Sequence, residues 1–133
     1  MAKANVPVFS IVQIIAMVSF STANTGRDGT SGTFATLYTA PSEGARISYI
    51  RVKATGTTTA GMVRIFIAPT SGGTKQLIAE IAIAAATPSA SVQSAEGEFY
   101  FTEPLLLPPS YTLFLTTHNN EAFHGFAMGS AYN

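Results

Sequence analysis

The apolar residues of this chain lie in short stretches, each bounded by Gly, Pro, Asn or Ser. Within the stretches, apolar and polar residues alternate, most regularly where Val63, Ile65 and Ile67 share one face and Arg64 lies on the other. Successive side chains of a strand point to opposite faces, so this period predicts strands with one buried and one partly wet face. No window of about 11 residues or more combines a helical apolar stripe with capping residues. The pattern therefore predicts an all-β chain.

Eight or so strands are expected, at nearly regular spacing. A sheet of this many strands would expose an apolar face, so we expect an antiparallel β-sandwich, jelly-roll-like, in a single domain spanning residues 1–133. Pro104 and Pro108 flank three leucines, 105–107, which are expected to form an extended crossover because proline removes ladder donors. The candidate strands are Val8 to Ser21, Thr33 to Thr39, Arg46 to Ala54, Met62 to Ala68, Gln76 to Ala84, a short Ala90 to Gln93, Glu98 to Thr102, Tyr111 to His118 and Phe123 to Ser130.

Charged residues are scarce and unevenly placed. They make up 11% of the chain, against roughly 25% in a typical soluble domain. The basic residues all lie between Lys3 and Lys75, whereas Glu80 and the later charged residues are all acidic. We expect these halves to pair across strands, with head-to-tail contact between copies as the alternative. Sparse charge also indicates a surface covered by other proteins, the alternative being a neutral monomer coated with Thr and Ser.

The N-terminal segment is strongly apolar. The run from Val6 to Val18 loosely imitates a signal peptide, but Pro7 and Gln13 interrupt it. It is also too short to span a bilayer, so no transmembrane segment is predicted. We expect residues 1–21 to form an N-terminal arm and a buried strand.

Candidate reactive side chains are few, and the chain has no cysteine. His118 and His124, with Glu121 between them, could offer a metal ion three ligands, but their spacing matches no known signature and a fourth ligand is lacking. Asp28, the sole aspartate, is expected to bond to its own glycine-rich turn rather than complete a Ser–His–Asp triad.

Other chemistries are weakly represented too. Glu96 and Glu98 are expected to face Arg or Lys across the sheet, so with Glu103 they are poor candidates for glycoside hydrolysis. The run from Phe99 to Phe101 is expected in the core and at an interface, since no basic residue accompanies it for nucleic-acid stacking. A phosphate-binding loop is absent from the sequence. We predict no catalytic residue, no cofactor site, no metal site and no enzymatic activity.

Three stretches, Asn24 to Thr30, Ile50 to Arg64 and Thr117 to Phe123, resemble small proteins encoded among the structural genes of tailed bacteriophages. The resemblance covers most of the chain beyond about residue 20 and concerns pattern, not a catalytic motif. It implies a jelly-roll or related β-sandwich that acts as a capsid decoration (cement) protein on the outer surface of the virion. The implied partners are the major capsid protein and copies of the chain itself, often as a homotrimer, with no nucleic acid and no membrane.

Other functions remain open. The chain could be a receptor- or glycan-binding module of a tail fibre or neck appendage, in which a tyrosine such as Tyr111 replaces the missing tryptophan. It could also be a hydrolase that depends on His118. For a shell protein, the segment from Val8 to Phe20 could add to the sheet edge of a neighbour, because unpaired edges recruit other strands.

Overall fold

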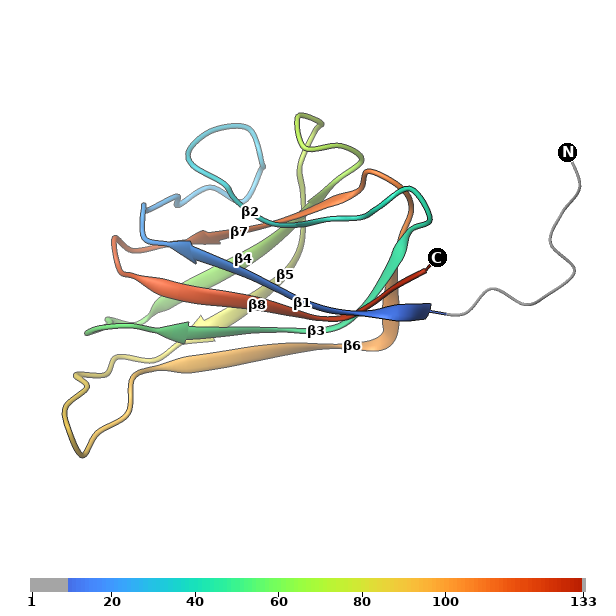
Figure 1. The fold of residues 1–133 in the computed structure, drawn as a ribbon. Coiled ribbons are helices and arrows are strands. Elements are labelled where there is room, and N and C mark those ends of the chain that lie inside the picture. Colours follow the sequence, from blue (N-terminus) through green and yellow to red (C-terminus); the bar gives the residue numbers. More distant parts are fainter. Residues whose placement is uncertain (1–9, 133) are drawn as a thin grey trace, which may run out of the picture.

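The computed structural model describes residues 10–132, which form eight strands and no helix (Figure 1). Two four-stranded antiparallel sheets result, which we call sheet A, in the order β1-β8-β3-β6, and sheet B, in the order β2-β7-β4-β5. The predicted all-β sandwich is therefore confirmed. The strands are β1 (Ser10–Phe20), β2 (Ala35–Thr39), β3 (Ala45–Ala54), β4 (Gly61–Ala68), β5 (Gln76–Ile83), β6 (Glu96–Leu107), β7 (Thr112–Thr117) and β8 (Phe123–Tyr132).

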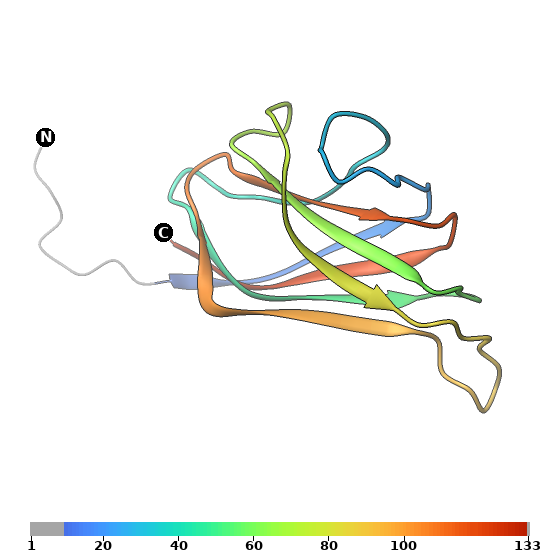
Figure 2. The same cartoon turned by 180° about the vertical axis from the view of Figure 1, so that it is seen from behind.

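The path of the chain between the sheets is that of a jelly roll. Only β4 and β5 are neighbours both along the chain and within one sheet, and every other connection passes from one sheet to the other. Figures 1 and 2 show the two layers from opposite sides, with sheet A nearer in the first view and sheet B nearer in the second. Two facing antiparallel sheets of eight strands with this order are the jelly-roll arrangement.

The core lies between the inner faces of the two sheets. Ile50 and Val52 of β3 are fully buried, as are Ile65 of β4 and Leu113 and Leu115 of β7. Burying each such side chain stabilises the fold by roughly 1.5–3 kcal/mol. The alternation that predicts these strands thus also predicts which side chains fill the core.

Two glycines allow the sheets to approach closely. A Cβ on Gly97 of β6 would lie 2.3 Å from Cγ2 of Ile81, and a Cβ on Gly125 of β8 would lie 2.3 Å from Cδ1 of Leu115. Neither distance is compatible with a side chain unless the neighbour moves. These glycines therefore serve close packing between layers rather than turns.

Two sequence expectations about the middle of the chain are wrong. Residues 90–93 do not form a strand, because Ser89 and Val92 bond to each other through their backbones in a turn. The three leucines, 105–107, are the last three residues of β6, paired with residues 45–47 of β3, and not a crossover. Pro104 is tolerated because β6 is an edge strand, where a missing N–H need not break a ladder. The register shifts there, and β6 turns sharply (Figure 1).

The expectation of a buried N-terminal strand is also wrong. β1 is an edge strand of sheet A, and none of its side chains from Val12 to Phe20 is fully buried. The part of the expected arm that precedes Ser10 lies outside the described residues. Within residues 10–132 the structure contains no helix that could cross a membrane.

Truncation of a core leucine tests the sandwich. We expect Leu113→Ala to lower the free energy of unfolding by about 3 kcal/mol, since a fully buried side chain is lost and a cavity remains. Leu106→Ala is the matched control, because Leu106 is 64% exposed and should cost less than about 0.5 kcal/mol. Urea denaturation measures both, and equal losses would contradict the assignment of the core.

Candidate interaction surface

The outer face of sheet A carries several large apolar side chains that the described residues leave uncovered. Antiparallel register aligns outward side chains from all four strands in continuous rungs. We call this surface the A face. It consists of Gln13, Ile15, Met17 and Ser19 of β1, His124, Phe126, Met128 and Ser130 of β8, Arg46, Tyr49, Arg51 and Lys53 of β3, and Glu96, Glu98, Tyr100 and Leu106 of β6.

Large apolar side chains on the A face are unusually accessible. Ile15 is 64% exposed, Met17 69% and Tyr100 63%. Ile15 lies in one rung with Met128, Tyr49 and Tyr100, so apolar and aromatic groups cross the whole sheet. A contiguous apolar patch of this kind marks a surface that normally contacts another molecule.

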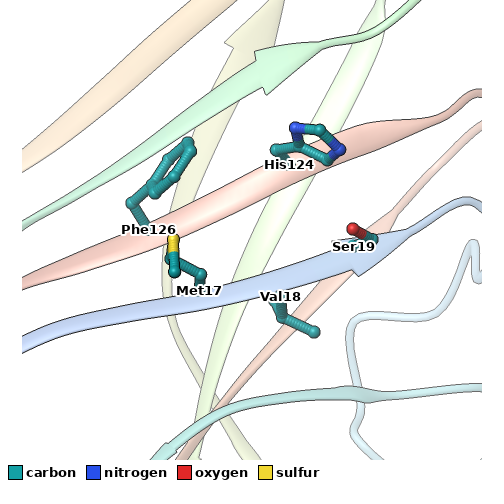
Figure 3. Close-up of a pocket in the computed structure, with 5 residues that line it drawn as sticks. All are labelled: Met17, Val18, Ser19, His124 and Phe126. Atoms are coloured by element: carbon teal, nitrogen blue, oxygen red, sulfur yellow. The ribbon is translucent and has the colours of Figure 1, made fainter.

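A shallow hollow of about 230 Å³ lies on the A face between β1 and β8. Met17 and Ser19 of β1 and His124 and Phe126 of β8 rise on the same side of the sheet, whereas Val18 points to the other side (Figure 3). Met17 and Phe126 lie at one end of the hollow and Ser19 and His124 at the other, so one end is apolar and the other polar (Figure 3).

Four charged side chains of the A face, Arg51, Lys53, Glu96 and Glu98, are paired with one another. Glu96 accepts hydrogen bonds from Arg51 at 3.1 Å and from Lys53 at 2.9 Å. Arg51 also lies 3.8 Å from a carboxylate oxygen of Glu98. The hydrogen bond and charge of Lys53, with the charge of Arg51, hold the pKa of Glu96 below its usual value. The expected pairing between basic and acidic halves of the chain is confirmed here.

Two tyrosines stack beside this charged stripe. The rings of Tyr49 and Tyr100 lie 5.0 Å apart between centroids. Tyr100 donates its hydroxyl to Glu98, and this hydrogen bond raises the pKa of Tyr100. Its neighbours Phe99 and Phe101 pack against the core, as predicted. The aromatic run therefore presents one tyrosine outward and two phenylalanines inward.

The outer face of sheet B is partly covered by the chain itself. Phe34, at the end of the connection of residues 21–34, packs its ring on Phe66 and Phe114 of the sheet. Lys75 places its ammonium group 4.8 Å from the centroid of the Phe114 ring. A second, small hydrophobic cluster thus forms outside the sandwich.

Arg64 is the centre of the contacts beneath this connection. It is 1% exposed, although the alternation of β4 predicts a partly wet face for it. Its Nε donates to Glu80 at 3.0 Å and its Nη1 to the carbonyl of Asn24 at 3.3 Å. Nη2 lies 3.2 Å from Nδ1 of His118. A guanidinium can only donate hydrogen bonds, so Nδ1 is the acceptor. Three partners satisfy the buried charge.

Asn24 fixes the connection that covers Arg64. Its backbone N–H donates to Thr117, and its side chain donates to the carbonyls of Ser31 and Thr33. Gly32 has a φ of 94° and packs directly on the Asn24 amide, which a side chain would obstruct. Sequence reasoning missed Asn24 and the burial of Arg64, and a lone arginine in an apolar strand is the signal that could have indicated them.

Most of the side chains considered for catalysis or metal binding have structural partners, whereas His124 is exposed in the hollow of the A face. His118 bonds to Arg64, and Glu121 accepts from the backbone and hydroxyl of Thr59. Asp28 accepts from the N–H of Thr30 within its own turn, as expected, and this bond lowers the pKa of Asp28. Among the described residues, no group of three or more His, Asp or Glu could hold a metal ion.

No known protein family matches this chain, and neither does any curated protein sequence. The resemblance to phage structural proteins therefore rests on the pattern of residues alone. The function is therefore inferred from the geometry of the surfaces.

Substitution of two arginines tests the buried cluster. Arg64 and Arg27 both contact the same oxygen of Glu80 at 3.0 Å through Nε, but their side chains are 1% and 57% exposed. We expect Arg64→Met to lower the free energy of unfolding by about 3 kcal/mol, because it leaves buried partners unsatisfied. Arg27→Met should cost less than about 1 kcal/mol, since solvent screens the pair. Similar losses in thermal or urea unfolding would contradict this assignment.

The charged stripe predicts a pH dependence. A lowered folded-state pKa means that Glu96 stabilises the fold above its unfolded pKa, and that this contribution is lost as pH falls through the folded value. Carboxyl titration by NMR should give a pKa below 4.5 for Glu96. Lys53→Met should raise that pKa, whereas Lys75→Met, on sheet B, should leave it unchanged. An unshifted pKa in Lys53→Met would show that the hydrogen bond is not its cause.

Proposed function

We propose that this chain is a virion structural protein of a tailed bacteriophage, a capsid decoration (cement) protein whose A face rests on the shell of the major capsid protein. The observation that carries the proposal is the uncovered apolar rung of Ile15, Met128, Tyr49 and Tyr100 across sheet A. A protein that binds a repeating shell needs a broad contact surface that symmetry multiplies, not a reactive cleft. We propose that the chain acts by binding rather than by catalysis.

The charges of the A face suit this role. Arg51 and Lys53 are already paired with glutamates of the same face, so burial against a partner would leave neither cation without a counter-charge. Arg46, beside the exposed Leu106, forms no ion pair with another described residue. A carboxylate of the shell protein at this rim would complement it.

The jelly-roll fold and the resemblance to phage structural proteins support the same role on the outer capsid surface. Both are independent of the A face.

A second function, binding of a receptor or glycan by a tail appendage, is favoured by one observation. Tyr100 is 63% exposed and stacked on Tyr49, which is the kind of aromatic platform that sugars contact. Tyr111, the tyrosine named from sequence, instead packs against the core. A glycan site would thus be sought at Tyr100.

The proposal is tested on shells purified from particles that lack this chain. We expect the protein to bind them saturably in a sedimentation assay. Met128→Glu should weaken binding by at least about tenfold, because it places a charge in the middle of the apolar rung. Circular dichroism and urea unfolding should show that the variant folds.

Val92→Glu is the matched control, since Val92 is 50% exposed on the connection between β5 and β6 and is not one of the residues of the A face. It should bind as the original chain does. Absence of saturable binding would overturn the capsid role. Glycan-array binding that Tyr100→Ala abolishes would establish the alternative instead.

A further inference from the structure

We propose that two copies of this chain join edge to edge through β1, in antiparallel orientation about a two-fold axis, so that two four-stranded A sheets become one sheet of eight strands. The contact is centred within residues 12–17. It involves the free edge of β1 rather than the A face, and it does not depend on the capsid role.

β1 has one open edge along its length. All of its ladder hydrogen bonds go to β8, and no other described element bonds to its backbone. Such an edge presents a row of donors and acceptors that match those of another strand. Near its end, Ser19 and Phe20 approach Ala35 of β2 around a small pocket, which leaves the portion from Val12 to Met17 as the accessible part.

The other three sheet edges carry features that discourage pairing. β6 contains Pro104 and three glutamates, and its register breaks in the middle. β2 has only five residues and a register shift, and β5 carries the Glu80 that Arg27 bridges. In contrast, β1 spans eleven residues with no charge, proline or glycine, and its register shift lies at its start, between Ser10 and Val12. Long, uncharged edges without such protection are those that pair with other chains.

The strand is compatible with a second copy of itself. When two identical antiparallel strands pair so that the outer and inner faces of the sheet both continue, outward residues of one strand lie opposite outward residues of the other. The exposed row of Gln13, Ile15 and Met17 would then meet its own counterpart, and no like charges would be opposed. A charged edge would repel its copy, whereas this one does not.

Pairing would also complete the burial of the inner row of β1. Ile14, Ala16 and Val18 pack against the core but remain only half-buried. A neighbouring β1 would cover their open side with the same three residues. A contact of this kind is two-fold, so it yields pairs of chains, whereas the resemblance to decoration proteins implies trimers.

The oligomeric state of the full chain tests this proposal. Light scattering coupled to gel filtration should give the mass of two chains, with dissociation on dilution. Ile15→Lys should give single chains at the same concentration, because two ammonium groups would meet near the axis. Ile15→Thr should remain paired, since threonine is uncharged and favours strands. A mass of one or three chains for the original protein overturns the proposal.

Crosslinking gives a second test that does not depend on stability. The chain has no cysteine, so single cysteines at Gln13, Ile15 or Met17 report only contact between copies. At least one of them should oxidise to a covalent pair, because directly opposed residues of antiparallel strands lie within disulfide reach. Val92→Cys should not, because Val92, although 50% exposed, lies on the connection that leads into β6, at the opposite edge of the sheet.

Two further outcomes separate the edge from the A face. Met128→Glu should keep the mass of two chains, because Met128 lies on β8 and not at the edge. Pairs that Met128→Glu disrupts and Ile15→Lys leaves intact would show that the faces, not the edges, associate. That result would overturn edge pairing whatever the protein does on a capsid.

Discussion

A sandwich of two sheets buries one face of each sheet in the core. The other face of each sheet points outward and must be covered by another part of the chain, be covered by a partner or remain exposed to solvent. The inner faces of this protein meet in an aliphatic core in which Ile50, Ile65 and Leu113 are fully buried. Close approach at Gly97 and Gly125 permits that contact. Both outer faces depend on this packing, because it decides which half of every alternating strand points outward.

The two outer faces differ in how much of each is covered by the rest of the chain. The outer face of sheet B is partly covered by the connection of residues 21–34, which Asn24 anchors and whose last residue, Phe34, packs on the sheet. Under it, Arg64 is buried with three partners, so a charge that would be costly in isolation is compensated. Sheet A has no such cover among the described residues and keeps Ile15 and Met17 exposed.

We propose that an uncovered apolar face and an unpaired edge beside it give this molecule two ways to contact other proteins. The face offers side chains and pre-paired charges, while the edge of β1 offers backbone groups. In the two proposals, one copy engages a shell through the A face and a second copy through the edge of β1, and Ile15 and Met17 belong to both surfaces. The low charge of the chain is consistent with surfaces that are normally covered.

Alternation of apolar and polar residues, with the glycines and prolines between them, was sufficient to determine the all-β class, the two-layer sandwich and most strand positions, because these depend on local periodicity. The opposition of Glu96 to basic residues also followed from the sequence. Only the tertiary structure decided what lies over each face: the burial of Arg64, the edge position of β1 and the extension of β6 past Pro104. Strand order and loop placement join residues far apart in the chain, and periodicity within a single strand contains no information about either.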